Sequence, residues 1–171
     1  MNFGTKIKFS IIYAVGPKGE FSTDDNKLPF TKNDLSYFKK ITTSDVKGNF
    51  IDGNIVIMGY QTYLSLPFLL PHRQHIVIAR PETELPDSTI FAVNLDDALI
   101  KADLIKSPES ENKRVFLIGG QKLIENAFTH PSLEHIYETI IPEKYIMSNV
   151  KINCLLTSKQ IKNKVIYHHV K

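Results

Sequence analysis

One carboxylate, Asp34, stands at the start of a segment whose apolar residues recur at helical spacing. Leu35, Phe38 and Ile41 would line one face of a helix that begins at Asp34, with Asn33 as its cap. A carboxylate in the first turn of a helix is favoured by the helix dipole alone, which is the more common reason for finding one there. The alternative is that Asp34 lies at the edge of the apolar face and looks into a pocket. This segment alone leaves both interpretations open.

Two glycine-containing junctions could hold phosphate groups. Gly59-Tyr60-Gln61-Thr62 and Ile118-Gly119-Gly120-Gln121 would each place backbone N–H groups and a helix N-terminus at the end of a strand. Each alone is a weak signal because short glycine turns are common connectors, but two in one parallel sheet suggest a dinucleotide. Arg80 could bind a further phosphate, although an exposed arginine beside a proline usually has no such role.

The elements that would position these residues alternate between strand and helix along the first 128 residues. Strands are expected where apolar runs are bounded by turn residues, at 6–15, 54–58, 75–79, 89–93, 114–118 and 135–141. Helices are expected at 34–41, 62–66, 121–128 and, capped by Asn94, through Ala102. This alternation predicts a single-domain α/β fold over residues 1–171, with a mostly parallel twisted central sheet and flanking helices.

The C-terminal part lacks expected helices. Strands at 150–152 and 164–170 predict an antiparallel hairpin added at one edge of the sheet. In parallel sheets, ligands collect where the carboxyl ends of strands meet helix N-termini, so the glycine junctions are the expected binding region.

Composition excludes several classes of function. The 171 residues carry a net charge of +3 with scattered basic residues, too weak a bias to indicate nucleic-acid binding. The single cysteine, Cys154, excludes an internal disulfide, and no Cys/His spacing indicates a metal site. Without a signal peptide or long apolar run, the sequence predicts a cytoplasmic protein with no membrane contact, and we expect a monomer.

Several blocks of the sequence, in their order and approximate spacing, resemble dihydrofolate reductase over roughly residues 8 to 141. No single block is decisive, but their joint order is very specific. The blocks are Ile12-Tyr13-Ala14-Val15, Leu28-Pro29-Phe30, Asp34-Leu35-Ser36-Tyr37-Phe38-Lys39, Val56-Ile57-Met58-Gly59, Thr62-Tyr63-Leu64-Ser65-Leu66-Pro67, Leu70-Pro71-His72-Arg73-Gln74-His75-Ile76-Val77, Val115-Phe116-Leu117-Ile118-Gly119-Gly120 and Ile136-Tyr137-Glu138-Thr139.

The resemblance implies NADPH-dependent reduction of dihydrofolate to tetrahydrofolate, and it implies roles for individual residues. Asp34 matches the acid that pairs with the pterin ring, Thr139 the threonine that hydrogen-bonds this acid, and Arg73 the arginine that binds the substrate's α-carboxylate. The implied pterin and benzoyl pocket consists of Ile12, Ala14, Phe30, Leu35, Phe38, Ser65, Leu66 and Ile118. The implied cofactor residues are Ala14, Gly59, Tyr60, Gln61, Thr62, Ala79, Arg80, Ile118, Gly119, Gly120, Gln121 and Lys122.

Elementary chemistry agrees with these implied roles. A carboxylate among apolar side chains should have a raised pKa, while the helix N-terminus opposes this, so we expect a modest rise for Asp34. The reduction requires a hydride at C6 and a proton at N5, and we expect the proton to arrive through water assisted by this carboxylate.

The sequence departs from the family pattern at several positions. Phe30 replaces the usual tryptophan, the link from 30 to 34 is short, and Glu20-Phe21-Ser22 replaces Gly-Ile-Gly. Tyr60 and Gln61 stand where basic residues often bind phosphates, so Arg80 and Lys122 would carry the preference for NADPH. Two alternatives follow: a reductase of another pterin or pyrimidine, or a degenerate member that binds a nucleotide or partner without catalysis.

Overall fold

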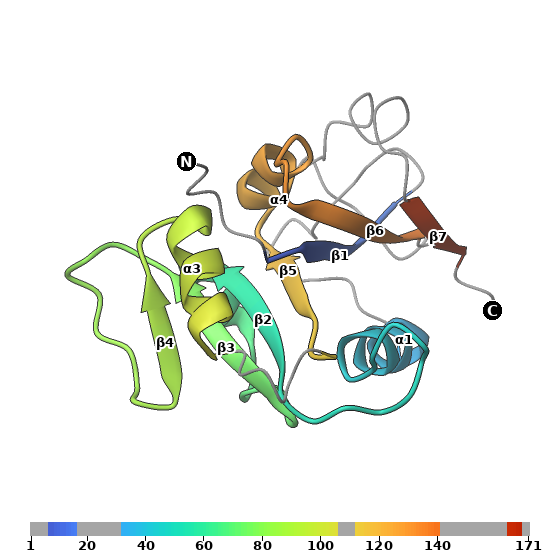
Figure 1. Ribbon diagram of the computed structural model, residues 1–171, viewed down its shortest axis with the longest axis horizontal. Coiled ribbons are helices and arrows are strands. Elements are labelled where there is room, and N and C mark those ends of the chain that lie inside the picture. Colours follow the sequence, from blue (N-terminus) through green and yellow to red (C-terminus); the bar gives the residue numbers. More distant parts are fainter. Residues whose placement is uncertain (1–6, 17–31, 106–111, 141–163, 169–171) are drawn as a thin grey trace.

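The computed structural model describes residues 7–16, 32–105, 112–140 and 164–168, with side chains for 7–16, 35–105 and 112–140. Within these residues one sheet contains every strand, in the order β4-β3-β2-β5-β1-β6-β7 (Figure 1). Each neighbouring pair runs parallel. The strands are β1 (Phe9–Val15), β2 (Asn54–Gly59), β3 (Arg73–Ile78), β4 (Thr89–Ala92), β5 (Val115–Gly119), β6 (Leu133–Ile140) and β7 (Lys164–His168).

The middle strands are apolar runs because both of their faces are covered. All residues of β1 and β5 are buried, as the dense apolar runs in the sequence predict. Four helices connect the strands and supply the covering layers. Within the described residues they are α1 (Lys32–Thr42), α2 (Tyr60–Ser65), α3 (Leu95–Ile105) and α4 (Gln121–Ala127).

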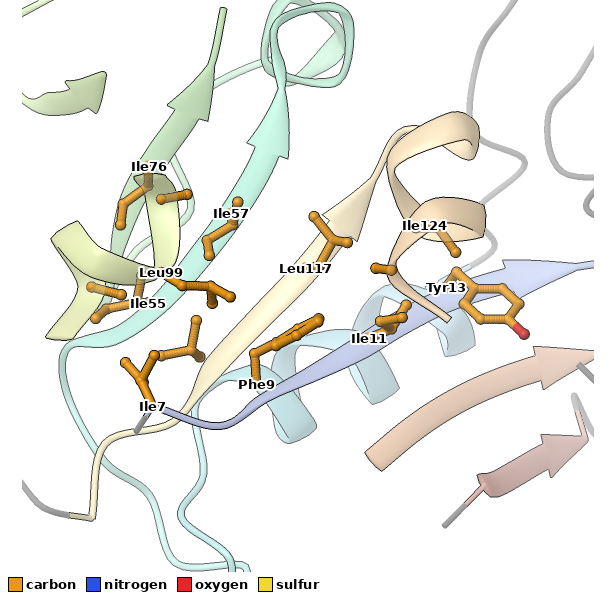
Figure 2. Close-up of a cluster of buried hydrophobic side chains, with 14 of the residues drawn as sticks. Ile7, Phe9, Ile11, Tyr13, Ile55, Ile57, Ile76, Leu99, Leu117 and Ile124 are labelled. Carbon is orange, nitrogen blue, oxygen red and sulfur yellow. The ribbon is translucent and has the colours of Figure 1, made fainter. Parts of the chain in front are cut away.

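One face of the sheet packs against α3 and α4. Leu99 of α3 and Ile124 of α4 are fully buried against alternate residues of the strands, among them Ile11, Ile57 and Leu117 (Figure 2). Burial of each such side chain contributes about 1.5–3 kcal/mol, so this face is the main core of the domain. The Asn94 side chain caps α3, since its Oδ1 accepts the Asp97 N–H at 2.8 Å.

The opposite face packs against α1, α2 and the segment that follows α2. Its buried residues are Ile12, Val56, Met58, Val77, Phe116 and Ile118. Phe38 of α1 and Leu66, just after α2, pack against them. The C-terminal end of α1 is attached to the sheet by Asn54, which is fully buried at the start of β2. Its Nδ2 donates to the carbonyls of Thr42 and Ser44 at 3.0 and 2.9 Å, and its Oδ1 accepts the Arg114 N–H at 2.8 Å.

One detail of the expected fold is wrong. The helix begins at Lys32, so Asn33 lies inside α1 and does not precede it. The last described strand, β7, pairs parallel with β6. The antiparallel hairpin expected from strands at 150–152 and 164–170 stays a prediction. The strand expected at 150–152 lies outside the described residues. In the part of the chain that is described, no helix has the length and apolar character needed to cross a membrane.

Candidate active site

A cleft of about 690 Å³ opens where the carboxyl ends of β2 and β3 meet the start of α2. It gathers seven of the residues that the sequence implies for the cofactor: Gly59, Tyr60, Gln61, Thr62, Ala79, Arg80 and Gly120. Ile78, Pro81, Thr83 and Val93 also line it, and sequence reasoning missed these four because their side chains carry no chemical signature. The cleft therefore lies at the expected edge of the sheet.

Glycines allow the two junctions to pack closely together at this edge. Gly119 has φ +158°, and a Cβ there would lie 2.8 Å from the Thr62 Oγ1, so a side chain at this position would force Thr62 to move. A Cβ at Gly59 would come within 3.1 Å of a Leu123 methyl group. The peptide bond between Gly119 and Gly120 is cis. The glycine junctions thus bring the N-terminal ends of α2 and α4 close together at this edge of the sheet, with Gly59 and Gly120 as the N-caps of the two helices.

The electrostatic character of the cleft depends on one side chain. Of the described residues that line it, Arg80 is the one that carries a positive charge. Tyr60 and Tyr63 stack with ring centroids 6.2 Å apart. The start of α2 therefore lines the cleft with the Tyr60 ring and the Gln61 amide, at the two positions where basic residues often bind phosphates. Lys122 is exposed on α4 and does not line the cleft. A polyanionic ligand here would therefore depend mainly on Arg80 for charge pairing.

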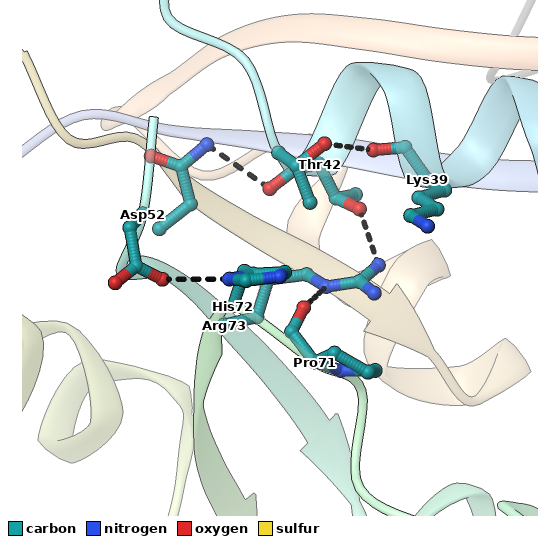
Figure 3. Close-up of polar contacts among 8 residues, drawn as sticks. Lys39, Thr42, Asp52, Pro71, His72 and Arg73 are labelled. Atoms are coloured by element: carbon teal, nitrogen blue, oxygen red, sulfur yellow. Dashed lines mark hydrogen bonds and ion pairs between the residues drawn. The ribbon is translucent and has the colours of Figure 1, made fainter. Parts of the chain in front are cut away.

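A second cation, Arg73, lies at the start of β3 beside α1. Its Nε donates to the Pro71 carbonyl and its Nη1 to the Thr42 hydroxyl, both at 2.9 Å (Figure 3). The guanidinium carbon lies 5.9 Å from the centroid of the Phe38 ring. Partial burial lowers the pKa of Arg73 from its usual value. The Arg73 side chain is thus oriented by two hydrogen bonds and by the face of the Phe38 ring.

Arg73 retains capacity to bind an anion. A guanidinium has five N–H donors, of which the Pro71 and Thr42 contacts use two. Among the described residues, no carboxylate forms an ion pair with Arg73. A partly buried cation without a counter-ion is costly, and a carboxylate ligand held by two parallel hydrogen bonds would offset that cost.

The residues implied for the ring pocket separate into two groups. Ile12, Phe38, Leu66 and Ile118 come together in the apolar cluster beneath α1 and α2. Ala14 is buried on β1, and Thr139 is buried at the position of β6 that pairs with it. Together these residues form an apolar wall with one hydroxyl-bearing side chain.

Other implied residues are placed differently. Leu35 is 50% exposed, and the Ser65 hydroxyl donates to the Thr62 carbonyl of its own helix at 2.6 Å. Gln121 donates to Glu125 at 2.9 Å. Asp34 lies in α1, but its side chain and the whole of Phe30 lie outside the described residues, as do Glu20, Phe21 and Ser22.

Thr42 and His75 are site residues that sequence reasoning missed. Thr42 accepts from Arg73 and donates to the Phe38 carbonyl at 2.8 Å, so it links the guanidinium to α1. His75 accepts a backbone hydrogen bond next to this site. Neither residue belongs to a local motif, and only the tertiary contacts reveal them.

Comparisons with known proteins identify related chains. The dihydrofolate reductase family model matches residues 8–154. The chain is 36% identical to a viral dihydrofolate reductase of Saimiriine herpesvirus 2 (strain 488), over 77% of this chain and 59% of the relative. It is also 36% identical to the dihydrofolate reductase of Bos taurus, over 71% of this chain and 65% of the relative. The chain therefore spans about three fifths of the length of these relatives.

Solved structures give the same result. Schistosoma mansoni dihydrofolate reductase superposes with a TM-score of 0.58 and 25% sequence identity, covering 75% of this chain and 70% of that one.

Proposed function

Because the chain belongs to the dihydrofolate reductase family, we propose that it reduces 7,8-dihydrofolate to 5,6,7,8-tetrahydrofolate with NADPH as the hydride donor. The observation that carries the proposal is Arg73, an oriented cation at the edge of an apolar wall, with N–H donors that no described residue uses. A substrate that combines a flat ring system with a carboxylate tail fits this pairing. A pterin or pyrimidine without a tail would leave the guanidinium without a counter-ion.

The cleft at the ends of β2 and β3 fits a dinucleotide. Gly59, Thr62 and Gly120 line it without bulky side chains, and Arg80 can pair with the 2′-phosphate. Gly119, behind Thr62, has room for no side chain and keeps the two junctions together. When bound, NADPH supplies the hydride that C6 of the substrate accepts, and a proton joins N5.

The chain's own residues would bind and orient the ring and supply its proton. Asp34 pairs with the amino and ring N–H groups of the pterin, and its charge favours protonation of N5 through water. Thr139 hydrogen-bonds this carboxylate, directly or through water. Ile12, Phe38 and Ile118 exclude bulk water from the ring, which strengthens these polar contacts. Arg73 binds the α-carboxylate and fixes the distance between tail and ring.

The direct test is NADPH oxidation by the purified chain with dihydrofolate as the acceptor. We expect turnover with dihydrofolate, and much weaker turnover with a dihydropterin that lacks the benzoylglutamate tail. Folded protein that binds NADPH but never oxidises it would favour a degenerate, non-catalytic member of the family. Equal efficiency with both acceptors would instead favour a reductase of another pterin.

We also propose that the enzyme acts as a cytoplasmic monomer. Light scattering coupled to size-exclusion chromatography would give the mass in solution, and a mass of twice the 19.5 kDa of the chain would contradict the proposed monomer.

A further inference from the structure

His75 lies directly behind the tail-binding arginine. It follows Arg73 by two positions on β3, so the two side chains point to the same face of the sheet. That face also carries Val77 of the apolar cluster. Only 3% of His75 is exposed, and its Nε2 accepts the backbone N–H of Leu70 at 3.0 Å. A buried imidazole is thus bonded to the segment that leads into the site.

The hydrogen bond fixes the protonation state of His75. An imidazole nitrogen accepts only when it carries no proton, so Nε2 is unprotonated and a neutral ring carries its proton on Nδ1. Burial lowers the pKa of His75, and the positive charge of Arg73 lowers it further, while a backbone hydrogen bond to Arg73 opposes these effects. The register partners of His75 on β2 and β4 are Val56 and Thr89, which are not titratable. Among the described residues, Arg73 is therefore the charged neighbour that affects the pKa of His75.

The segment that His75 holds is the one that orients Arg73. Leu70 precedes Pro71, whose carbonyl accepts from the Arg73 Nε. His72 then adopts φ +67°, a sharp turn that few non-glycine residues make. Earlier in the same segment, Phe68 is 66% exposed and packs little. The hydrogen bond from Leu70 to His75 therefore restrains the backbone one residue before the Pro71 carbonyl, which accepts from the Arg73 guanidinium.

We propose that His75 is a positioning residue for the substrate's carboxylate tail. Its Nε2 holds Leu70, Leu70 fixes the Pro71 carbonyl, and that carbonyl orients the Arg73 guanidinium. The inference rests on the proposed function, because it assumes that Arg73 binds a carboxylate of dihydrofolate. It assigns no contact between His75 and the substrate.

Three substitutions separate this role from a merely structural one. His75→Leu removes the acceptor, and His75→Asn places its amide near the position of Nδ1, too short to reach Leu70. His75→Gln can place its Oε1 near the position of Nε2 and restore the bond. A net hydrogen bond corresponds to about a threefold to tenfold change in an equilibrium constant. We expect His75→Leu and His75→Asn to raise KM for dihydrofolate by about that factor, with kcat changing less than twofold and His75→Gln close to wild type.

The selective readout is the acceptor substrate. The KM for a dihydropterin without the tail should stay within about twofold of wild type in all three variants, because this substrate does not use Arg73. In a double-mutant cycle, His75→Leu should add little to Arg73→Leu, since both act on one interaction. Amide hydrogen exchange at Leu70 should accelerate in His75→Leu and recover in His75→Gln.

Each contrary result has a distinct meaning. Equal losses for both acceptors in His75→Leu, while Arg73→Leu discriminates between them, would overturn the role of His75 and leave the proposed function standing. Unchanged exchange at Leu70 in His75→Leu would overturn it as well. If Arg73→Leu itself fails to discriminate, the tail-binding part of the proposed function fails, and the inference falls with it.

Discussion

The two faces of the central sheet use polar side chains in opposite ways. On the face covered by α3 and α4, the buried Tyr13 hydroxyl donates to Glu138 at 2.8 Å, and the rest of the buried cluster is hydrocarbon. On the face covered by α1 and α2, Arg73 has N–H donors that bond to none of the described residues, and it lies beside an apolar wall. A polar group whose bonding is complete contributes to the fold, whereas one with spare capacity indicates where a ligand fits. The first face maintains the domain, and the second carries the proposed chemistry.

Asp34→Asn should give the largest effect and tests the second face. The amide keeps the shape but loses the charge that favours a proton at N5, so we expect kcat near neutral pH to fall by about 10²-fold or more. The loss should shrink at acid pH, where the substrate is protonated without help. Steady-state rates across a pH series measure this, and the same loss at every pH would contradict the proton-supply role.

Leu99→Ala tests the first face. Truncating this fully buried side chain should lower the free energy of unfolding by about 2–5 kcal/mol. Because Leu99 lies across the sheet from the site, kcat and KM of the folded fraction should stay near wild type. Urea denaturation and assays at low temperature measure the two quantities, and a large change in KM would show that the faces are coupled.

Arg73→Leu should weaken binding of dihydrofolate by about 1.5–3 kcal/mol, the range for hydrogen bonds to charged groups. A dihydropterin without the tail should lose little. Fluorescence titration of both ligands in wild type and variant gives the comparison. Similar losses for the two would mean that Arg73 serves the fold, as Tyr13 and Glu138 do on the other face.

Arg80→Ala should have the smallest effect of the four. We expect KM for NADPH to rise by about fivefold while KM for NADH hardly changes, because Arg80 is exposed and an exposed charge pair contributes about 1 kcal/mol at most. Lys122→Ala is the matched control, since Lys122 is exposed but does not line the cleft. A larger rise for Lys122→Ala than for Arg80→Ala would assign phosphate recognition to α4.

Local sequence signals predicted much of this architecture and part of the site. Apolar runs predicted the strands because a strand buried on both faces needs apolar residues throughout. The glycine junctions predicted the edge at which the cleft lies, because the close packing there leaves no room for a Cβ at Gly119. The parallel pairing of β7 with β6 could not be predicted, since the direction of a strand depends on the path of the chain before it rather than on the strand's own residues. Thr42 was not predicted as a site residue because its partner Arg73 is 31 positions away in the sequence. Whether Asp34 faces the pocket stays a prediction.

The carboxamide of Asn54 has a mechanical consequence. Because its three hydrogen bonds join Thr42 and Ser44, at the end of α1, to the start of β2 and to the residue before β5, that end of the helix is a fixed point. Movement of α1 against the sheet is therefore smallest at this end and grows with distance along the helix toward Asp34.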